Sequence, residues 1–321
     1  MNARALLVGL AAGLASALLF AGLVTQSVSA LGLSLAAPIP ILIASLGWGS
    51  AAGIAAALVS AGVIAGITGT PAGGLMILAT IGAPAAFIGH LCGLARPSDD
   101  PQRQATPPLT GPAPVPLDWY PLDRVLFAAA LSASAGCLVM GWLIGYDAES
   151  AVPMLQEALS AQAGAGLDID DAQIEDLSRM VVSIVPFVQP AVLTLTLCGS
   201  LYLAAAITRL SGRLQRPKDD IPSQAGLPRL ALPIFAVALA ISFLEGALGN
   251  VAAVFAGALG AAFTLVGLAA FHHRTRGRSG RGLLLFTVYF AIVVLTFPIF
   301  AFLVYGVFKA ARPGVGTQSS N

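Results

Sequence analysis

Four polar residues lie inside long apolar stretches of the sequence, where a polar side chain is costly to place. They are His90, Gln189, Glu245 and Asn250, and their neighbours are almost all aliphatic, aromatic or small. A charged group at the centre of a bilayer costs about 2.5–3.5 kcal/mol on insertion scales, so a residue of this kind is a default candidate for function. We predict that these four side chains bind a small polar solute, with Glu245 as the strongest candidate.

Each candidate also has a plain structural interpretation. Glu245 can mark a loop and point into water, and His90 can be a neutral histidine bonded to a backbone carbonyl near the membrane interface. Gln189 stands between Pro186 and Pro190. Prolines in a membrane helix free backbone carbonyls, a geometry that transporters use to bind polar ligands, but they can equally produce a kink without a ligand.

The sequence contains none of the motifs that would indicate an enzyme. It has no P-loop, no G-x-G-x-x-G after a strand, no H-E-x-x-H and no G-x-S-x-G, so we expect no ATP hydrolysis, redox chemistry or proteolysis and no cofactor. Cys92, Cys137 and Cys198 have no metal-ligand spacing and are predicted to be buried thiols. The acidic stretch 168–175 lacks the glycine of an EF-hand loop, which favours a solvated helix cap over a metal site.

The elements that must position these residues are transmembrane helices. Hydrophobic residues make up 57% of the chain and charged residues only 10%, whereas soluble proteins have roughly 25% charged residues. We therefore predict an all-α polytopic bundle of eight or nine crossings, with a short second run and a last run that can kink or fold back at Pro298. The apolar runs lie near 5–28, 33–47, 50–68, 73–95, 124–146, 180–208, 231–249, 251–273 and 283–308.

Charge in the loops predicts the orientation. The segments 96–124, 209–229 and 274–281 hold twelve of the sixteen basic residues, whereas 147–178 carries eight acidic residues and neither Lys nor Arg. Because basic loops stay on the cytoplasmic side, the N-terminus and the basic loops are predicted to be cytoplasmic and 147–178 periplasmic. The side of the C-terminus remains open, because the last run can fold back.

The same pattern divides the chain into regions. Residues 1–95 are expected to form about four spans, 96–123 a loose Pro-rich cytoplasmic linker, 124–312 the remaining spans and 313–321 a disordered tail. The first apolar run is longer than the core of a signal peptide, which favours a retained helix. Within the acidic loop, we expect an interfacial helix over 153–163 and a second helix from about Asp170.

Two pairs of small residues on the first helix are spaced four positions apart, Ala11 with Ala15 and Ala17 with Ala21. Such spacing lets helix backbones approach closely, either within the chain or against a partner membrane subunit. The basic run His272–Arg281 could hold anionic lipid headgroups or RNA. A short loop that follows the positive-inside rule needs no such ligand, and we expect no nucleic acid partner.

Several Gly-, Pro- and Ala-rich motifs resemble the DUF2232 (YybS-like) family of bacterial polytopic membrane proteins. They are Leu35-Ala36-Ala37-Pro38-Ile39-Pro40, Gly47-Trp48-Gly49, Pro71, Gly82-x-Pro84, the run 205–217 with Arg209, Arg213 and Arg216, and Gly267-Leu268-Ala269. The resemblance covers nearly the whole chain and implies a bacterial inner membrane protein. It also implies a distant similarity to the S components of energy-coupling-factor vitamin transporters.

In those S components, a small-residue first helix docks on the transmembrane coupling subunit, a role that the resemblance would give to Ala11, Ala15, Ala17 and Ala21 here. S components usually have about six helices, so the extra spans and the acidic loop are a departure. We therefore expect an S-component-like protein that sits in the lipid bilayer and binds or transports a small solute without its own ATPase. The alternative is a scaffold or accessory subunit that does not transport and holds a partner membrane complex.

Overall fold

The computed structural model describes residues 3–22, 32–99, 116–163 and 170–312. Within these ranges the regular secondary structure is helical apart from one short antiparallel pair of strands, β1 (Ala95–Pro97) and β2 (Leu117–Trp119). The predicted all-α class is confirmed, and the apolar helices agree with a protein that passes through a membrane several times.

The described helices account for all nine predicted apolar runs, but they are not equally long. Six are long and apolar enough to cross a membrane: α1 (Ala3–Ala21), α4 (Ser50–Thr68), the segment Pro71–Gly93, α8 (Leu122–Ile144), α10 (Asp171–Leu210) and α13 (Ala247–Arg274). The bent pair α14 (Arg281–Leu295) and α15 (Pro298–Ala311) would count as a seventh span only if the two helices crossed together as one. The shorter helices α3 (Pro38–Trp48) and α12 (Ala231–Ile241) explain the difference from the eight or nine expected crossings.

Prolines begin or modify several of these helices. Pro38 and Pro71 occupy first turns, where a missing N–H costs nothing, and the Thr70 hydroxyl accepts a hydrogen bond from the Gly73 N–H. The segment Pro71–Gly93 is continuous but contains a π-helical turn, with α5 (Pro71–Ile77), η2 (Leu78–Gly82) and α6 (Ala83–Gly93) in succession. Pro84 lies two residues after that turn, and its missing N–H explains why the regular hydrogen-bond ladder is interrupted there.

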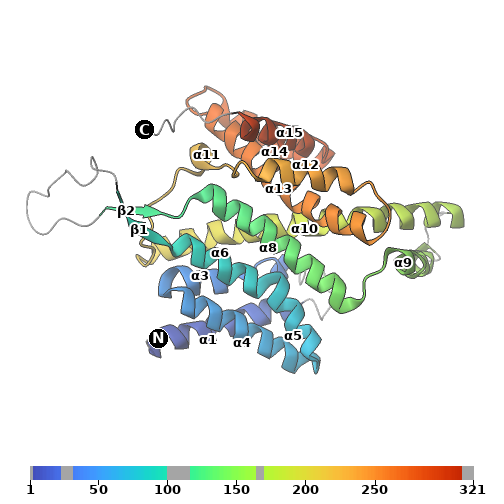
Figure 1. Ribbon diagram of the computed structural model, residues 1–321, viewed down its shortest axis with the longest axis horizontal. Helices are drawn as coiled ribbons and strands as arrows, with labels where there is room; N and C mark the ends of the chain where they lie inside the picture. Colours follow the sequence, from blue (N-terminus) through green and yellow to red (C-terminus); the bar gives the residue numbers. More distant parts are fainter. Residues whose placement is uncertain (1–2, 23–31, 100–115, 164–169, 313–321) are drawn as a thin grey trace, which may run out of the picture.

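The helices form three layers, which Figure 1 shows from blue at the bottom to red at the top. One outer layer is the N-terminal group of α1, α3, α4 and α5 to α6, with a core that includes Ile41, Leu42 and Ile88. The other is the C-terminal group of α12, α13, α14 and α15, where Phe235 packs on Phe263. Helices α8 and α10 lie between the two groups and contact both.

The last apolar run folds back on itself. Helices α14 and α15 are bent by 117° at residues 296–297, and α15 packs closely along α13. A Cβ added at Gly267 or Gly306 would lie 1.9 Å from a backbone carbonyl oxygen of the facing helix, so only glycine permits this approach. The end of α15 returns to the basic side, because the Lys309 ammonium donates to the Ala225 carbonyl at 2.9 Å.

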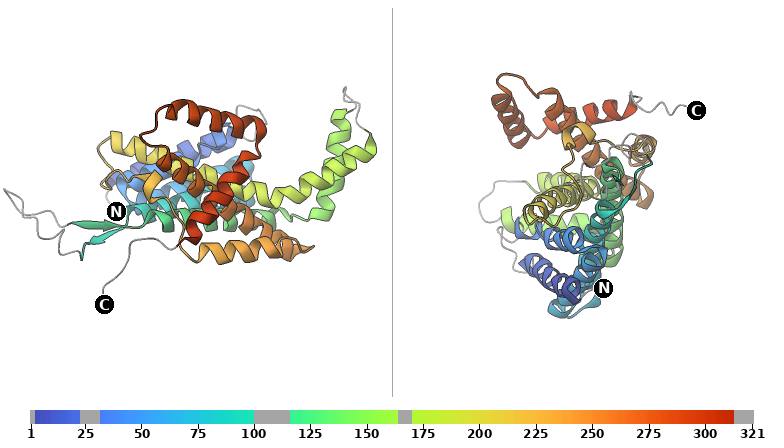
Figure 2. Two further views of the ribbon diagram at one scale, coloured as in Figure 1. Left: turned by 90° about the horizontal axis from the view of Figure 1, so that it is seen from above. Right: turned by 90° about the vertical axis from the view of Figure 1, so that its left-hand side faces the viewer.

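The acidic loop contains both expected helices. Helix α9 (Ala148–Ala163) begins before the predicted residue 153, and α10 begins after Asp170, whose side chain forms a capping box with Gln173. Helix α10 has 40 residues and is therefore about 60 Å long, twice the thickness of the hydrocarbon core. In Figure 2, α9 and the start of α10 project at one end of the molecule, and the strand pair projects at the other.

The ends of the Pro-rich linker are ordered, which the interpretation as a loose linker missed. Arg96 in β1 lies opposite Asp118 in β2, and α8 begins at Leu122. The middle of the linker, residues 100–115, and the tail, residues 313–321, lie outside the described residues.

Candidate functional site

A cavity of about 1490 Å³ lies at the end of the molecule that carries the acidic loop. Its walls are the second half of α8, the start of α9, the first half of α10 and the beginning of α13. This volume exceeds the range of roughly 300–1,000 Å³ that is typical of small-molecule sites. The cavity therefore has room for an organic solute together with water.

Three of the four predicted site residues line this cavity. Gln189 comes from the middle of α10, Glu245 from the turn between α12 and α13, and Asn250 from the first turn of α13. The Gln189 side-chain amide nitrogen donates to the Met140 sulfur of α8 at 3.6 Å, whereas its side-chain oxygen accepts no hydrogen bond from the described residues. Glu245 is exposed in its turn, so the loop interpretation and the cavity interpretation of this residue are both partly correct.

The prolines of α10 shape the cavity wall. A proline at position 186 has no N–H, so the Val182 carbonyl, one turn earlier, loses its helical partner. Tyr146 donates its hydroxyl to that carbonyl at 3.4 Å, and both residues line the cavity. Burial and the neighbouring Asp147 raise the pKa of Tyr146, which keeps the phenol neutral and able to donate. This hydrogen bond between Tyr146 and Val182 was not predicted from the sequence.

The cavity lining carries an excess of negative charge. Asp147, Glu149, Glu175 and Glu245 contribute carboxylates, and Arg179 is the one basic residue among the lining residues. Arg179 pairs with Glu175 at 2.6 Å on the exposed surface of α10. Because that pair is neutral as a whole, three carboxylates remain to set the local field, which attracts cations.

The fourth predicted residue, His90, lies elsewhere. It sits near the end of α6, where its Nδ1 atom is 2.6 Å from the hydroxyl of Ser50 in the first turn of α4. Both side chains are half-buried and neither lines the cavity. The structure thus gives His90 a hydrogen-bond partner in a neighbouring helix and separates it from Gln189, Glu245 and Asn250.

The four alanines of α1 do not share one face. Ala17 is completely buried, so it is not available to a partner subunit, and Ala15 and Ala21 are only half-buried. Ala11 is exposed and shares its face with leucines such as Leu14 and Leu18. The small residues that take α1 closest to another helix are its glycines, because a Cβ at Gly13 would lie 2.6 Å from the Ala56 carbonyl oxygen of α4.

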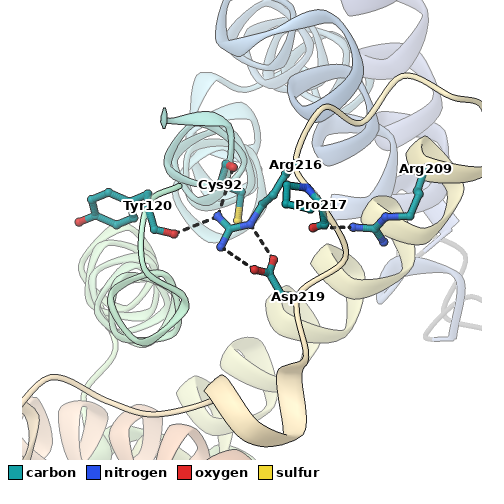
Figure 3. Close-up of polar contacts among 6 residues, drawn as sticks. All are labelled: Cys92, Tyr120, Arg209, Arg216, Pro217 and Asp219. Carbon is teal, nitrogen blue, oxygen red and sulfur yellow. Dashed lines mark hydrogen bonds and ion pairs between the residues drawn. The ribbon is translucent and has the colours of Figure 1, made fainter. Parts of the chain in front are cut away.

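At the opposite end, Arg216 forms the most buried charged contact of the described chain, which Figure 3 shows. Its guanidinium pairs with Asp219 at 2.7 Å and donates to the carbonyls of Cys92 at 3.4 Å and Tyr120 at 2.9 Å. Cys92 belongs to the last turn of α6, whose carbonyls have no partner within the helix. The 209–229 loop is therefore joined to the end of α6 and the start of α8.

Two further contacts extend from the 209–229 loop. The Arg213 guanidinium lies over the Trp48 ring of α3, 4.4 Å from its centre, and Asp220 pairs with Arg276 beyond α13. Sequence reasoning found the basic residues of this loop but not these contacts. The only available signal was the acidic pair Asp219 and Asp220 inside a loop that is otherwise basic.

Within the described residues, no group of three His, Cys, Asp or Glu side chains is placed to hold a metal ion. Comparison of the chain with protein-family models, with curated proteins and with solved structures found no match. The resemblance to the DUF2232 (YybS-like) family stays a prediction.

Proposed function

We propose that this chain binds a small polar solute in the cavity at its acidic end, as a transporter-like membrane protein without an ATPase of its own. The observation that carries the proposal is that Gln189 of α10 lines one large cavity together with Glu245 and Asn250, which come from the turn before α13 and from its first turn. Ligand sites are typically concave and mostly apolar with a few convergent polar groups, and this cavity has that composition.

The charge of the lining supports one class of solute. Three carboxylates without a basic partner in the lining favour a cationic or zwitterionic solute, such as an organic amine, over an anion. The amides of Gln189 and Asn250 can each donate and accept, so they suit a solute with neutral polar groups beside its charge.

The orientation belongs to the same proposal. The positive-inside rule puts the 209–229 loop in the cytoplasm and the cavity mouth on the periplasmic side of a bacterial inner membrane. A solute would then enter from outside. If the S-component resemblance holds, a membrane coupling subunit would supply the energy, and Ala11 is the one of the four predicted alanines that is exposed for such a partner.

Native mass spectrometry of the gently extracted protein tests solute binding, because it reports bound small molecules and bound subunits together. We expect a co-purifying cationic or zwitterionic metabolite that is lost in Gln189→Leu and Glu245→Gln. The matched controls are Gln224→Leu on the short helix α11 (Ile221–Gln224) and Glu157→Gln on α9, both exposed and outside the cavity lining. Equal metabolite retention in site and control variants would contradict the proposal.

The same measurement addresses the alternative of a membrane scaffold. A stoichiometric protein partner together with an empty cavity would mean that the helices serve assembly, and the solute-binding proposal should then be abandoned. A partner found together with a bound metabolite would instead support an S-component-like arrangement.

A further inference from the structure

A second, smaller cavity of about 240 Å³ lies at the basic end, between the ends of α13 and α15 and the short helix α11. Four of its eight lining residues are basic or can become so, namely His273, Arg274, Lys309 and Arg312, and none is acidic. The cavity is distinct from the one at the acidic end and shares no lining residue with it. Its small volume suits a single compact group and not a drug-sized molecule.

The basic side chains around this cavity are not neutralised by the nearby carboxylates. Asp219 pairs with Arg216, and Asp220 pairs with Arg276 and lies near His273, so neither acidic residue of the 209–229 loop forms an ion pair with Arg274, Lys309 or Arg312. Within the described residues, Arg274 and Arg312 form no ion pair, and the Lys309 ammonium contacts only the Ala225 carbonyl. A cluster of cations without a counterion inside the protein attracts an anion from outside.

The cavity also lies at the depth of the lipid headgroups. Helix α13 is apolar up to Phe271, and its basic residues begin at His272, so its end marks the boundary between membrane and water. Tyr305 lines the cavity and accepts a hydrogen bond from Arg274 at 3.4 Å. Tyrosine is enriched at that boundary, and basic pockets between helices on the cytoplasmic side hold anionic lipid headgroups.

We propose that this cavity binds a phosphate group, held by Arg274, Lys309 and Arg312, at the cytoplasmic end of α13 and α15. The group can belong to an anionic phospholipid or to a free phosphate. Because α15 reaches this position only by folding back at residues 296–297, a bound phosphate also joins the returning helix to α13 through charge, in addition to the glycine contacts.

A native mass spectrometry titration of the detergent-solubilised full chain tests this site. The probes are a short-chain phosphatidylglycerol, phosphatidylcholine of the same chain length, and inorganic phosphate. The test variant is Arg274→Gln with Arg312→Gln, and the control is Arg229→Gln with Arg278→Gln, which removes the same charge from exposed residues outside the cavity. We expect phosphatidylglycerol to bind and the test variant to weaken it about thirtyfold, or about fivefold for each charge removed.

The arms separate the two sources of phosphate. Preferential binding of phosphatidylglycerol that inorganic phosphate does not displace assigns the site to a lipid, whereas competition by inorganic phosphate assigns it to a free anion. Equal weakening in the test and control variants, or no binding of either probe, would overturn the proposal. A third variant, Lys309→Arg, keeps the charge and should retain binding, which guards against a loss that comes only from misfolding.

Discussion

The two ends of this bundle differ in how their charges are used. At the basic end, the 209–229 loop is tied down by the buried pair of Arg216 with Asp219, by Arg213 over Trp48 and by the contact of Lys309 with Ala225. At the acidic end, the helices separate around a cavity of about 1490 Å³, and three of its carboxylates have no basic partner in the lining.

The basic end is therefore closed by long-range contacts, whereas the acidic end is open. Arg216 reaches carbonyls that precede it by 124 and 96 residues, so it joins its loop to the end of α6 and to the start of α8. The contacts of Asp220 with Arg276 and of Ala225 with Lys309 join the same loop to the C-terminal group. No comparable buried ion pair crosses the cavity among the described residues. Such an arrangement suits a protein that admits a solute from one side only.

Removing the Arg216 side chain should break the closed end most severely. Arg216→Ala leaves Asp219 without its partner, and side chains with 7% and 22% exposure place this pair in a largely buried setting. Breaking such a pair costs about 3 kcal/mol, which thermal denaturation in detergent would measure. Arg209→Ala is the control, because its 3.5 Å contact with the Pro217 carbonyl is exposed and long. Equal losses in the two variants would argue against a special role for Arg216.

A methyl group at Gly257 should damage the wall of the open end. An added Cβ would lie 2.1 Å from the Phe187 carbonyl oxygen of α10, so Gly257→Ala forces α13 and α10 apart and is expected to cost about 2 kcal/mol. At Gly199, also on α10, nothing lies within 4 Å of an added Cβ. Gly199→Ala should therefore be neutral or stabilise the helix by up to about 1 kcal/mol in the same denaturation assay.

Replacement of Gln189 should affect the function of the open end without affecting stability. Gln189→Leu removes the side-chain amide from the cavity lining, while the new side chain has a similar volume at this exposed position. We therefore expect the solute affinity to fall up to about tenfold, with little change in the melting temperature. Titration of the purified protein with the co-purifying metabolite would measure the affinity. An unchanged affinity would place the solute away from α10.

The ion pair of Asp220 with Arg276 should give the smallest effect and a defined pH dependence. Hydrogen bonds from Arg276 and Ser223 hold the pKa of Asp220 below its ordinary value of 3.8. The pair therefore contributes stability above that value and loses it as the pH falls below it. The melting temperature of Asp220→Asn should be slightly lower than that of the native chain at neutral pH, and the two should converge in acid. If the difference in melting temperature between the native chain and Asp220→Asn did not change with pH, Asp220 would be excluded as the titrating group.

The sequence anticipated the helices and part of the site. Apolar runs marked the long membrane helices and the short apolar helices α3 and α12, because membrane helices are defined by composition, but they did not mark α11. Polar exceptions in those runs led to Gln189, Glu245 and Asn250. The contacts of Arg216 and the strand pair lie in loops. Loop sequences have no periodic pattern, so they do not predict which distant segment lies beside them. The separation of His90 from the other three residues follows from the way the helices pack. A polar residue in an apolar run does not by itself predict this packing.

Thiol labelling of Gln189→Cys, in a chain whose native cysteines are replaced by alanine, tests most directly that the bundle is open only at its acidic end. A membrane-impermeant reagent is added to sealed vesicles from one side at a time. Labelling from the side of the acidic loop, but not from the side of the 209–229 loop, is the predicted result. Labelling of this position from the side of the 209–229 loop would show that the closed end is not closed and would contradict the proposed entry path.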